Sequence, residues 1–478
     1  NTLPRWPLAQ PFRYLAHNGE LNTITGNRNW SEARTPKLKS DKLPNLNELT
    51  PLVNSTGSDS SSLDNMLEVL MSGGMNLFHA MSILVPPAWQ IVDSMDLDLR
   101  AFYEFYSQHM EAWDGPAGLV IQDGRYAVCM LDRNGLRPSR WVTTKNGYIT
   151  VASEVGVWDY SPKDVLAKGR VGPGQMLVID TLTGQILDTK AIATLLKKAH
   201  PYRKWLREEA TRIRDDERLE EELAAQTCRG NELKTLQKMY HITNEERTEI
   251  IRPNAENGQE PVGSMGDDTP MAVLSQQIRH VGDFFRQQFA QVTNPPIDPL
   301  RESIVMSLQT CLGAETNVFA PSARDAHRII LSSPVLSASK MQQLETLGDP
   351  AFKMARIDLN YDRILELSEA ITAICEQVAN SIRAGHTLIV LSDKDIDADK
   401  VPANAIMVTG AVHHYLIGQG IRTDANLIIE TGLARDSHQV AVLIGFGATC
   451  VYPYLAYDVI DDLVATGELL GDPIQARV

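Results

Sequence analysis

The strongest constraint on the fold is the hydrophobic pattern in the second half of the chain. Apolar runs typical of buried strands recur at residues 387–391, 426–430 and 449–452. Each run is separated from the next by enough residues for a helix. Alternation of strands and helices favours βαβ units and a parallel sheet. We therefore expect this half to form an α/β domain with parallel strands.

The first 200 residues show a different pattern, in which short apolar runs are broken by turn residues. Residues 118–128 (GLVIQDGRYAV) carry an Asp-Gly turn between two apolar runs. Asn146-Gly147 precedes the apolar run 148–152 in the same manner. Both patterns predict antiparallel hairpins.

One helix stands out among these hairpins. It is predicted over residues 63–71, with serines 60–62 as capping candidates and Gly73-Gly74 after its end. Together with the hairpins, this helix indicates a mixed α+β domain.

The middle of the chain differs from both halves. Residues 203–250 are dense in charges of both signs and have apolar positions at helical spacing, which is typical of exposed helices. At roughly 100–200 residues per domain, 478 residues suggest a multidomain protein. We divide it into a first domain (1–200), a charged helical connector (201–255) and a second domain (256–478).

Composition excludes several classes of function. With 45 Lys and Arg against 60 Asp and Glu, the net charge of −15 argues against binding to nucleic acid or an anionic membrane. No apolar run approaches the roughly 18 residues needed to span a bilayer. The cysteines lie too far apart for a zinc or iron–sulfur pattern, so we expect no metal site and a reducing, cytoplasmic compartment: Cys129, Cys228, Cys311, Cys375 and Cys450.

The most informative motif is residues 12–30, FRYLAHNGELNTITGNRNW. An Asn-Gly pair such as Asn18-Gly19 is by itself usually a tight turn. However, this segment and the preceding PRWPLAQP (4–11) closely resemble the glutaminase domain of the glutamate synthase large-subunit family, a class II glutamine amidotransferase. The resemblance implies the αββα fold of N-terminal-nucleophile hydrolases.

In that family the Asn-Gly pair forms the oxyanion hole. A cysteine thiolate attacks the glutamine amide, and the Asn side chain and the Gly backbone N–H stabilise the oxyanion. An amide donates without carrying a charge, and glycine lets the backbone approach the oxygen closely. The resemblance therefore implies that Asn18 and Gly19 form the oxyanion hole.

A second match is residues 56–65, TGSDSSSLDN. In the family this loop holds an Asp that binds the α-amino group of glutamine, which the resemblance assigns to Asp59. Without the resemblance, an Asp in a Gly/Ser loop ahead of a helix would be interpreted as a helix N-cap. Asp64 is the alternative ligand, although it falls inside the predicted helix.

A third block, LDRNGLRPSR (131–140), is also typical of these glutaminase domains. Its charged residues could hold the loop by salt bridges alone, which is the interpretation that we favour. Asp132, Arg133 and Arg137 remain candidates for residues that support the site from behind.

The second half resembles the central domain of glutamate synthases, on four blocks of sequence: 257–270, 284–302, 424–430 and 445–457. In the family this domain joins the glutaminase to an FMN-binding barrel. The resemblance implies glutamine and 2-oxoglutarate as substrates, and FMN and a 3Fe-4S cluster as cofactors that this stretch does not itself bind. Electrons would come from ferredoxin or from a small subunit with FAD and NAD(P)H.

Two residues of the family's site find no match. The family's nucleophile is an N-terminal Cys, whereas residue 1 is Asn and the first cysteine, Cys129, lies in a strand-like run. The Arg that binds the glutamine carboxylate is also not matched. We therefore expect a fragment that does not hydrolyse glutamine alone. The alternatives are a non-catalytic scaffold and another class II amidotransferase.

A calcium-like acidic pattern needs separate mention. Asp393, Asp395 and Asp397 alternate as in a calcium loop, but the required Gly and the bidentate Glu are missing. We interpret this stretch as a solvated acidic loop.

Overall fold

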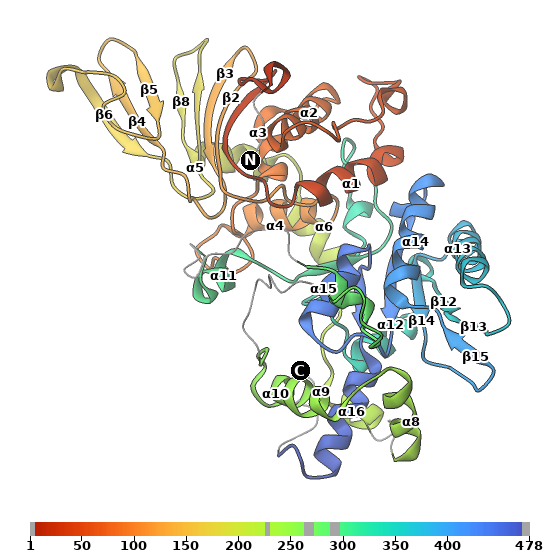
Figure 1. Cartoon of the computed structure of the whole chain (residues 1–478). Coiled ribbons are helices and arrows are strands. Elements are labelled where there is room, and N and C mark those ends of the chain that lie inside the picture. Colours follow the sequence, from red (N-terminus) through yellow and green to blue (C-terminus); the bar gives the residue numbers. More distant parts are fainter. Residues whose placement is uncertain (1–4, 225–229, 262–271, 287–296, 471–478) are drawn as a thin grey trace. The chain divides into compact units, whose positions relative to one another are not determined.

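The computed structural model describes residues 5–224, 230–261, 272–286 and 297–470 (Figure 1). Its contacts divide the chain into two compact units, each of which is described by itself. The first unit contains the described residues of three segments, Asn1–Ala210, Pro296–Ser307 and Glu315–Arg328. The second unit contains those of Thr211–Pro295, Leu308–Ala314 and Ile329–Val478.

An antiparallel sheet of order β1-β2-β3-β7-β8 forms the centre of the first unit. Its strands are β1 (Leu15–Gly19), β2 (Ala117–Gln122), β3 (Tyr126–Leu131), β7 (Met176–Asp180) and β8 (Ile186–Leu187). The hairpin predicted at the Asp-Gly turn is confirmed, because β2 pairs with β3. Strand β1 adds to the edge of β2, a pairing between segments about a hundred residues apart in the sequence.

A smaller sheet of order β5-β4-β6 lies beside the first. Its strands are β4 (Arg140–Thr144), β5 (Ile149–Ala152) and β6 (Val165–Arg170). The predicted Asn-Gly hairpin is confirmed, and Gly147 adopts the positive φ of +79° that such a turn requires. Cys129 and Leu131 of β3 contribute to a small core that also includes Trp141 of β4.

Helices cover the larger sheet and share one hydrophobic core with it. They are α1 (Ile24–Arg34), α2 (Asp59–Ser72), α3 (Leu77–Leu84), α4 (Leu97–Ser107), α5 (Thr189–Lys198) and α6 (Tyr202–Glu209). Residues Leu63, Leu67 and Leu70 recur along one face of α2 and are fully buried, as an amphipathic helix requires.

The predicted helix in this region is confirmed, but its start was placed too late. Helix α2 begins at Asp59, and the Oγ atom of Ser58 accepts the N–H of Ser61 as the N-cap. The expected caps, serines 60–62, are inside the helix and buried, and their hydroxyls form hydrogen bonds with His17 and Asn54. The helix ends at Gly73-Gly74 as predicted.

The second unit is built on a parallel sheet of order β12-β14-β16-β17, which confirms the predicted parallel strands. Its strands are β12 (Met354–Asp358), β14 (Leu388–Ser392), β16 (Asn426–Glu430) and β17 (Cys450–Tyr452). Helices α13 (Leu367–Arg383), α14 (Ala405–Gly418), α15 (Ser437–Gly445) and α16 (Tyr454–Ala465) alternate with them. The central strands β14 and β16 are entirely buried, as expected for a parallel sheet that is covered on both faces, whereas the edge strand β12 exposes Arg356 and Asp358.

The helices expected to form an exposed connector are divided between the two units. Helix α6 belongs to the first unit, where Tyr202 and Leu206 join the core. Helices α7 (Glu217–Ala224), α8 (Asn231–Met239), α9 (Asn244–Glu246) and α10 (Arg252–Asn257) belong to the second unit. Helix α8 packs Leu233 into a core cluster, with Leu236 and Met239 against it, as an amphipathic helix does. Helices α9 and α10 have no buried residue.

The interpretation of residues 393–397 as a solvated loop is wrong for Asp393 and right for Asp395 and Asp397, which are exposed. Asp393 directly follows β14 and is fully buried. Its carboxylate accepts hydrogen bonds from the hydroxyl of Thr431 and from the N–H of Gly432, the latter at 3.0 Å. Burial raises the pKa of Asp393 to about 6.

Candidate active site

Asn18 and Gly19 end strand β1 rather than forming a tight turn between two strands. Asn18 lies opposite Gly118, and Gly19 lies opposite Ala117. Asn18 is exposed to solvent. The pair therefore stands at the end of an edge strand, where a ligand from solvent can reach it.

Gly19 is required by a close backbone approach. A Cβ atom at this position would lie 1.7 Å from the carbonyl oxygen of Pro116, and the N–H of Glu20 donates to that same oxygen at 2.9 Å. Any side chain would push the two segments apart. The residue type is thus fixed by packing as well as by the chemistry expected of it.

Asp59 lies close to this pair in space. Its Oδ2 atom accepts the N–H of Leu21, two residues after Gly19, at 2.9 Å. The Asp59 side chain is about 20% exposed. Because Ser58 is the N-cap of α2, the capping role considered for Asp59 is wrong. The structure therefore brings together the sequence-predicted residues Asn18, Gly19 and Asp59.

Asp64, the alternative ligand, is already engaged by the backbone. Its carboxylate accepts the N–H groups of Arg13, Tyr14 and Leu15 at 3.2, 2.9 and 3.0 Å, and the residue is 4% exposed. These bonds fix the start of β1 to helix α2. Asp64 is thus a structural residue of the site.

His17 is a residue of the site that the sequence analysis missed. Its Nδ1 atom lies 2.9 Å from Oγ of Ser60 and 3.7 Å from Oδ2 of Asp59. The side chain is fully buried, and burial lowers the pKa of His17 despite the nearby Asp59 carboxylate. A neutral imidazole therefore joins the end of β1 to the start of α2. The available signal was its position directly before the Asn-Gly pair.

Asp132 holds its loop by a different means from the expected salt bridges. Its carboxylate accepts the N–H groups of Ala117, Asn134 and Gly135 at 2.7, 2.8 and 3.1 Å. Burial raises the pKa of Asp132 although these bonds favour its ionised form. Since Ala117 is the cross-strand partner of Gly19, Asp132 supports the Asn-Gly pair through the backbone of Ala117.

The two arginines of this block have separate surroundings. Arg133 does form a salt bridge, from Nε to Oδ1 of Asp114 at 3.1 Å, with both side chains mostly buried. Arg137 is exposed, and its Cβ atom would lie 3.3 Å from a Cβ atom at Gly118, the partner of Asn18. Arg137 is therefore a neighbour of the strand that pairs with Asn18, whereas the partners of Arg133 are Asp114 and Val305.

The buried cysteines are not activated thiols. Cys129, Cys375 and Cys450 are free, and burial raises the pKa of each thiol. A cysteine nucleophile needs the opposite shift, because the thiolate is the reactive form. None of these three residues has the surroundings of a catalytic cysteine.

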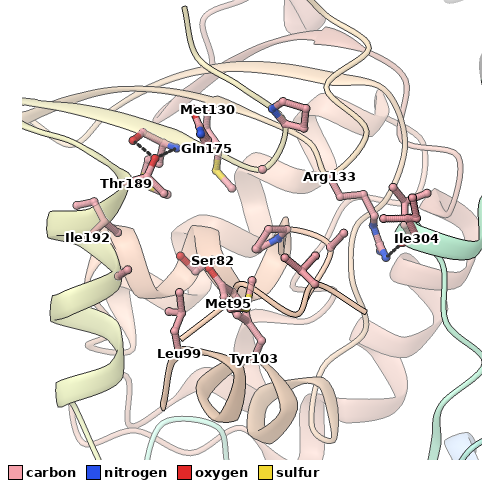
Figure 2. A pocket seen from close by; sticks show the side chains of 18 of the residues that line it. Ser82, Met95, Leu99, Tyr103, Met130, Arg133, Gln175, Thr189, Ile192 and Ile304 are labelled. Atoms are coloured by element: carbon pink, nitrogen blue, oxygen red, sulfur yellow. Dashed lines mark hydrogen bonds between the residues drawn. The ribbon is translucent and has the colours of Figure 1, made fainter. Parts of the chain in front are cut away.

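A cavity of about 700 Å³ in the first unit is distinct from this site (Figure 2). Its wall is mostly apolar and includes Met95, Leu99, Tyr103, Met130 and Ile192. Neither the Asn-Gly pair nor Asp59 contributes to it.

In the described ranges no group of three or more His, Cys, Asp or Glu side chains is placed to hold a metal ion. None of the helices in those ranges is both long and apolar enough to cross a bilayer.

Two family models match the chain. The model of class-II glutamine amidotransferases matches residues 1–205, and the model of the glutamate synthase central domain matches residues 235–477. The second match covers slightly more than half of the chain. Two blocks that suggested it, 257–270 and 284–302, lie partly outside the described residues.

Curated relatives agree with both matches. The NADPH glutamate synthase large chain of Bacillus subtilis is 40% identical over 470 residues, which are 98% of this chain and 30% of that protein. The ferredoxin-dependent glutamate synthase of Antithamnion sp. is 39% identical over 469 residues, covering 96% of this chain and 30% of that protein. The NADH glutamate synthase of Schizosaccharomyces pombe is 38% identical over 478 residues, covering 97% of this chain and 23% of that protein.

A solved structure, the allosteric regulatory enzyme of purine biosynthesis, is 18% identical over 36% of this chain and 27% of that one. Its TM-score of 0.21 is too low to compare the folds.

The first part of the chain is thus of the class II glutamine amidotransferase type. The chain as a whole belongs to the glutamate synthase family. It spans less than a third of the length of the relatives named above.

Proposed function

We propose that this chain is part of a glutamate synthase that hydrolyses L-glutamine and uses the ammonia to convert 2-oxoglutarate into L-glutamate. The observation that carries the proposal is the meeting of Asn18, Gly19 and Asp59 at the end of β1, through the bond from Leu21 N–H to Asp59. Residues assigned from two separate motifs thus lie together at one end of the sheet, as a shared site requires.

The proposed roles follow from charge. The Asp59 carboxylate binds the α-ammonium of glutamine, and a charge-assisted bond in a partly buried site is strong. When a thiolate attacks the amide carbon, negative charge develops on the amide oxygen. The side-chain amide of Asn18 and the N–H of Gly19 stabilise that charge, which lowers the barrier because the interaction strengthens in the transition state.

The thiolate and the group that binds the glutamine carboxylate come from residues other than those assigned here. The raised pKa values of the buried cysteines support this view for the nucleophile. Asp132 and Arg137 act on the site through the backbone and through charge, respectively. We propose the αββα fold for the glutaminase part, which the helix layer and two sheets of the first unit support.

We propose the cofactors and partners of the complete enzyme from its membership of the glutamate synthase family. They are FMN, a 3Fe-4S cluster, and either ferredoxin or a small subunit with FAD and NAD(P)H. The described cysteines do not form a cluster site, so we assign the iron–sulfur cluster to other parts of the enzyme. No step that we propose for this chain uses these groups. The free cysteines support a reducing, cytoplasmic location.

Two variants of the complete enzyme test the proposal. Asn18→Ala should lower kcat for glutamine hydrolysis, whereas Asp59→Asn should raise KM for glutamine. Glutamate formation from added ammonia should continue in both variants, because that route bypasses the glutaminase site. If both variants lose both activities equally, these residues serve folding and the proposed site is wrong.

A further inference from the structure

Helix α11 (Pro299–Val305) comes from the far half of the sequence but belongs to the first unit. The residues that follow it, Leu308–Ala314, belong to the second unit. Asp298 caps the helix by accepting the N–H of Arg301 at 2.8 Å. A short element is thus contributed to the glutaminase part by a distant segment of the chain.

Two arginines bind α11 to the loop that contains Asp132. The Nη2 atom of Arg301 donates to the carbonyl oxygen of Asn134. In return, the Nη1 atom of Arg133 donates to the carbonyl oxygen of Val305 at 3.0 Å. Figure 2 shows Arg133 extending toward α11 beside Ile304. The helix and the loop thus each donate from one arginine to a backbone carbonyl of the other, and we call this pair of contacts the arginine clasp.

One route leads from the clasp to Gly19 through backbone hydrogen bonds. Asn134, whose carbonyl oxygen accepts the hydrogen bond of Arg301, donates its N–H to the carboxylate of Asp132 at 2.8 Å. Asp132 also accepts the N–H of Ala117 at 2.7 Å, and Ala117 pairs with Gly19. The position of Gly19 therefore depends on a loop that α11 holds.

A second route reaches the other side of the same turn. Arg133 binds Val305 with one nitrogen and Asp114 with another. The carbonyl oxygen of Asp114 accepts the N–H of Asn22 at 2.7 Å. Asn22 lies three residues after Gly19, so the two routes reach both ends of the turn that begins at Gly19.

We propose that α11 is a positioning element for the oxyanion pair, and that Arg301 and Arg133 are its positioning residues. The proposal rests on the proposed function. Oxyanion donors act only when they lie within hydrogen-bond distance of the oxygen in the transition state, so a small displacement lowers the rate. Asp59 belongs to helix α2, and the route from Arg301 through Asp132 to Gly19 does not include that helix, so loss of Arg301 should spare substrate binding.

The test uses the complete enzyme with Arg301→Met, which keeps the stem of the side chain and removes the donors. Loss of one charge-assisted bond at this distance from the reacting atoms should lower kcat for glutamine hydrolysis about 5–30-fold. KM for glutamine should change less than about twofold, because the substitution removes no contact that binds glutamine in the ground state. Backbone amides of residues 132–135 should exchange hydrogen faster than in the wild type.

Two comparison variants make the result specific. Leu300→Ala changes an exposed apolar side chain on the same helix and should leave kcat and the exchange rates unchanged. Arg301→Lys should recover part of the lost kcat, because lysine keeps one charged donor. Glutamate formation from added ammonia should stay at the wild-type level in all three variants.

The proposal is overturned if Arg301→Met leaves kcat unchanged, or if kcat falls together with ammonia-dependent synthesis, which would indicate a general structural role. A wild-type enzyme that releases no ammonia from glutamine would refute the proposed function instead. In that case the exchange rates of residues 132–135 decide whether α11 positions the loop, and unchanged rates would refute it.

Discussion

The Nδ1 atom of His17 lies 2.9 Å from Oγ of Ser60, and this contact joins the strand that ends in Asn18 and Gly19 to the helix that begins with Asp59. Because the His17 side chain is fully buried, the contact is shielded from water. It links the residues expected to bind the ammonium with those expected to stabilise the oxyanion.

This contact predicts energetic coupling between the two elements. His17→Ala and Ser60→Ala should each destabilise the fold, but the double variant should lose less than the sum. The coupling energy in a double-mutant cycle should be about 0.5–1.5 kcal/mol, the usual net contribution of a buried hydrogen bond. Denaturant unfolding of the four proteins measures it. Additive losses would show that the two side chains do not interact.

Asp64 should be a stability residue with no role in binding. Asp64→Ala leaves three backbone N–H groups without their acceptor, so the free energy of unfolding should fall by about 2–4 kcal/mol. Glu68→Ala, on the same helix, removes only a partly exposed ion pair with Arg13 and should change it by less than about 1 kcal/mol. Comparable losses in the two variants would contradict the anchoring role of Asp64.

Asp59→Asn in the complete enzyme should act on glutamine binding. The amide oxygen of Asn can still accept the N–H of Leu21, whereas the charge that pairs with the ammonium is lost. KM for glutamine should rise by roughly 10–150-fold, which corresponds to about 1.5–3 kcal/mol. The melting temperature should stay close to that of the wild type. An unchanged KM would place the ammonium contact elsewhere.

Asp393 should make the stability of the second unit depend on pH. Its pKa is about 6 in the folded chain against an ordinary 3.8, so the folded state binds the proton more tightly. The resulting stabilisation is complete below pH 3.8 and is lost as the pH rises through about 6.

The free energy of unfolding of the wild type, relative to Asp393→Asn, should therefore be greater at pH 5 than at pH 7 by about 1–1.5 kcal/mol. Denaturant unfolding of both proteins at the two pH values gives this difference directly, since other titrating groups cancel. A difference that is the same at both pH values would mean that Asp393 has an ordinary pKa.

The sequence predicted those features that depend on local pattern. The parallel strands around residues 388–392 and the hairpins at the Asp-Gly and Asn-Gly turns follow from periodicity and turn chemistry, and both are present. The Asn-Gly pair and Asp59 were found by resemblance to a family. Their meeting in space is a result of the structure.

The features that were missed depend on contacts between distant residues. Arg34 is buried because it binds Glu111 and Glu315, the latter 281 residues away, and no local pattern indicates such a partner. Asp393 looked like part of an exposed acidic loop, but it is buried directly after β14, where the hydroxyl of Thr431 and the N–H of Gly432 donate to its carboxylate. The contribution of α11 to the first unit is of the same kind.

The account depends most on Asn18 as an oxyanion donor, and the decisive measurement is kcat for ammonia release from glutamine by the complete enzyme with Asn18→Ala. Loss of one such donor should lower kcat by about 10²–10³-fold, with a smaller change in KM and with synthesis from added ammonia retained. A kcat within a few-fold of the wild type, or an equal loss of ammonia-dependent synthesis, would contradict the assignment of this site.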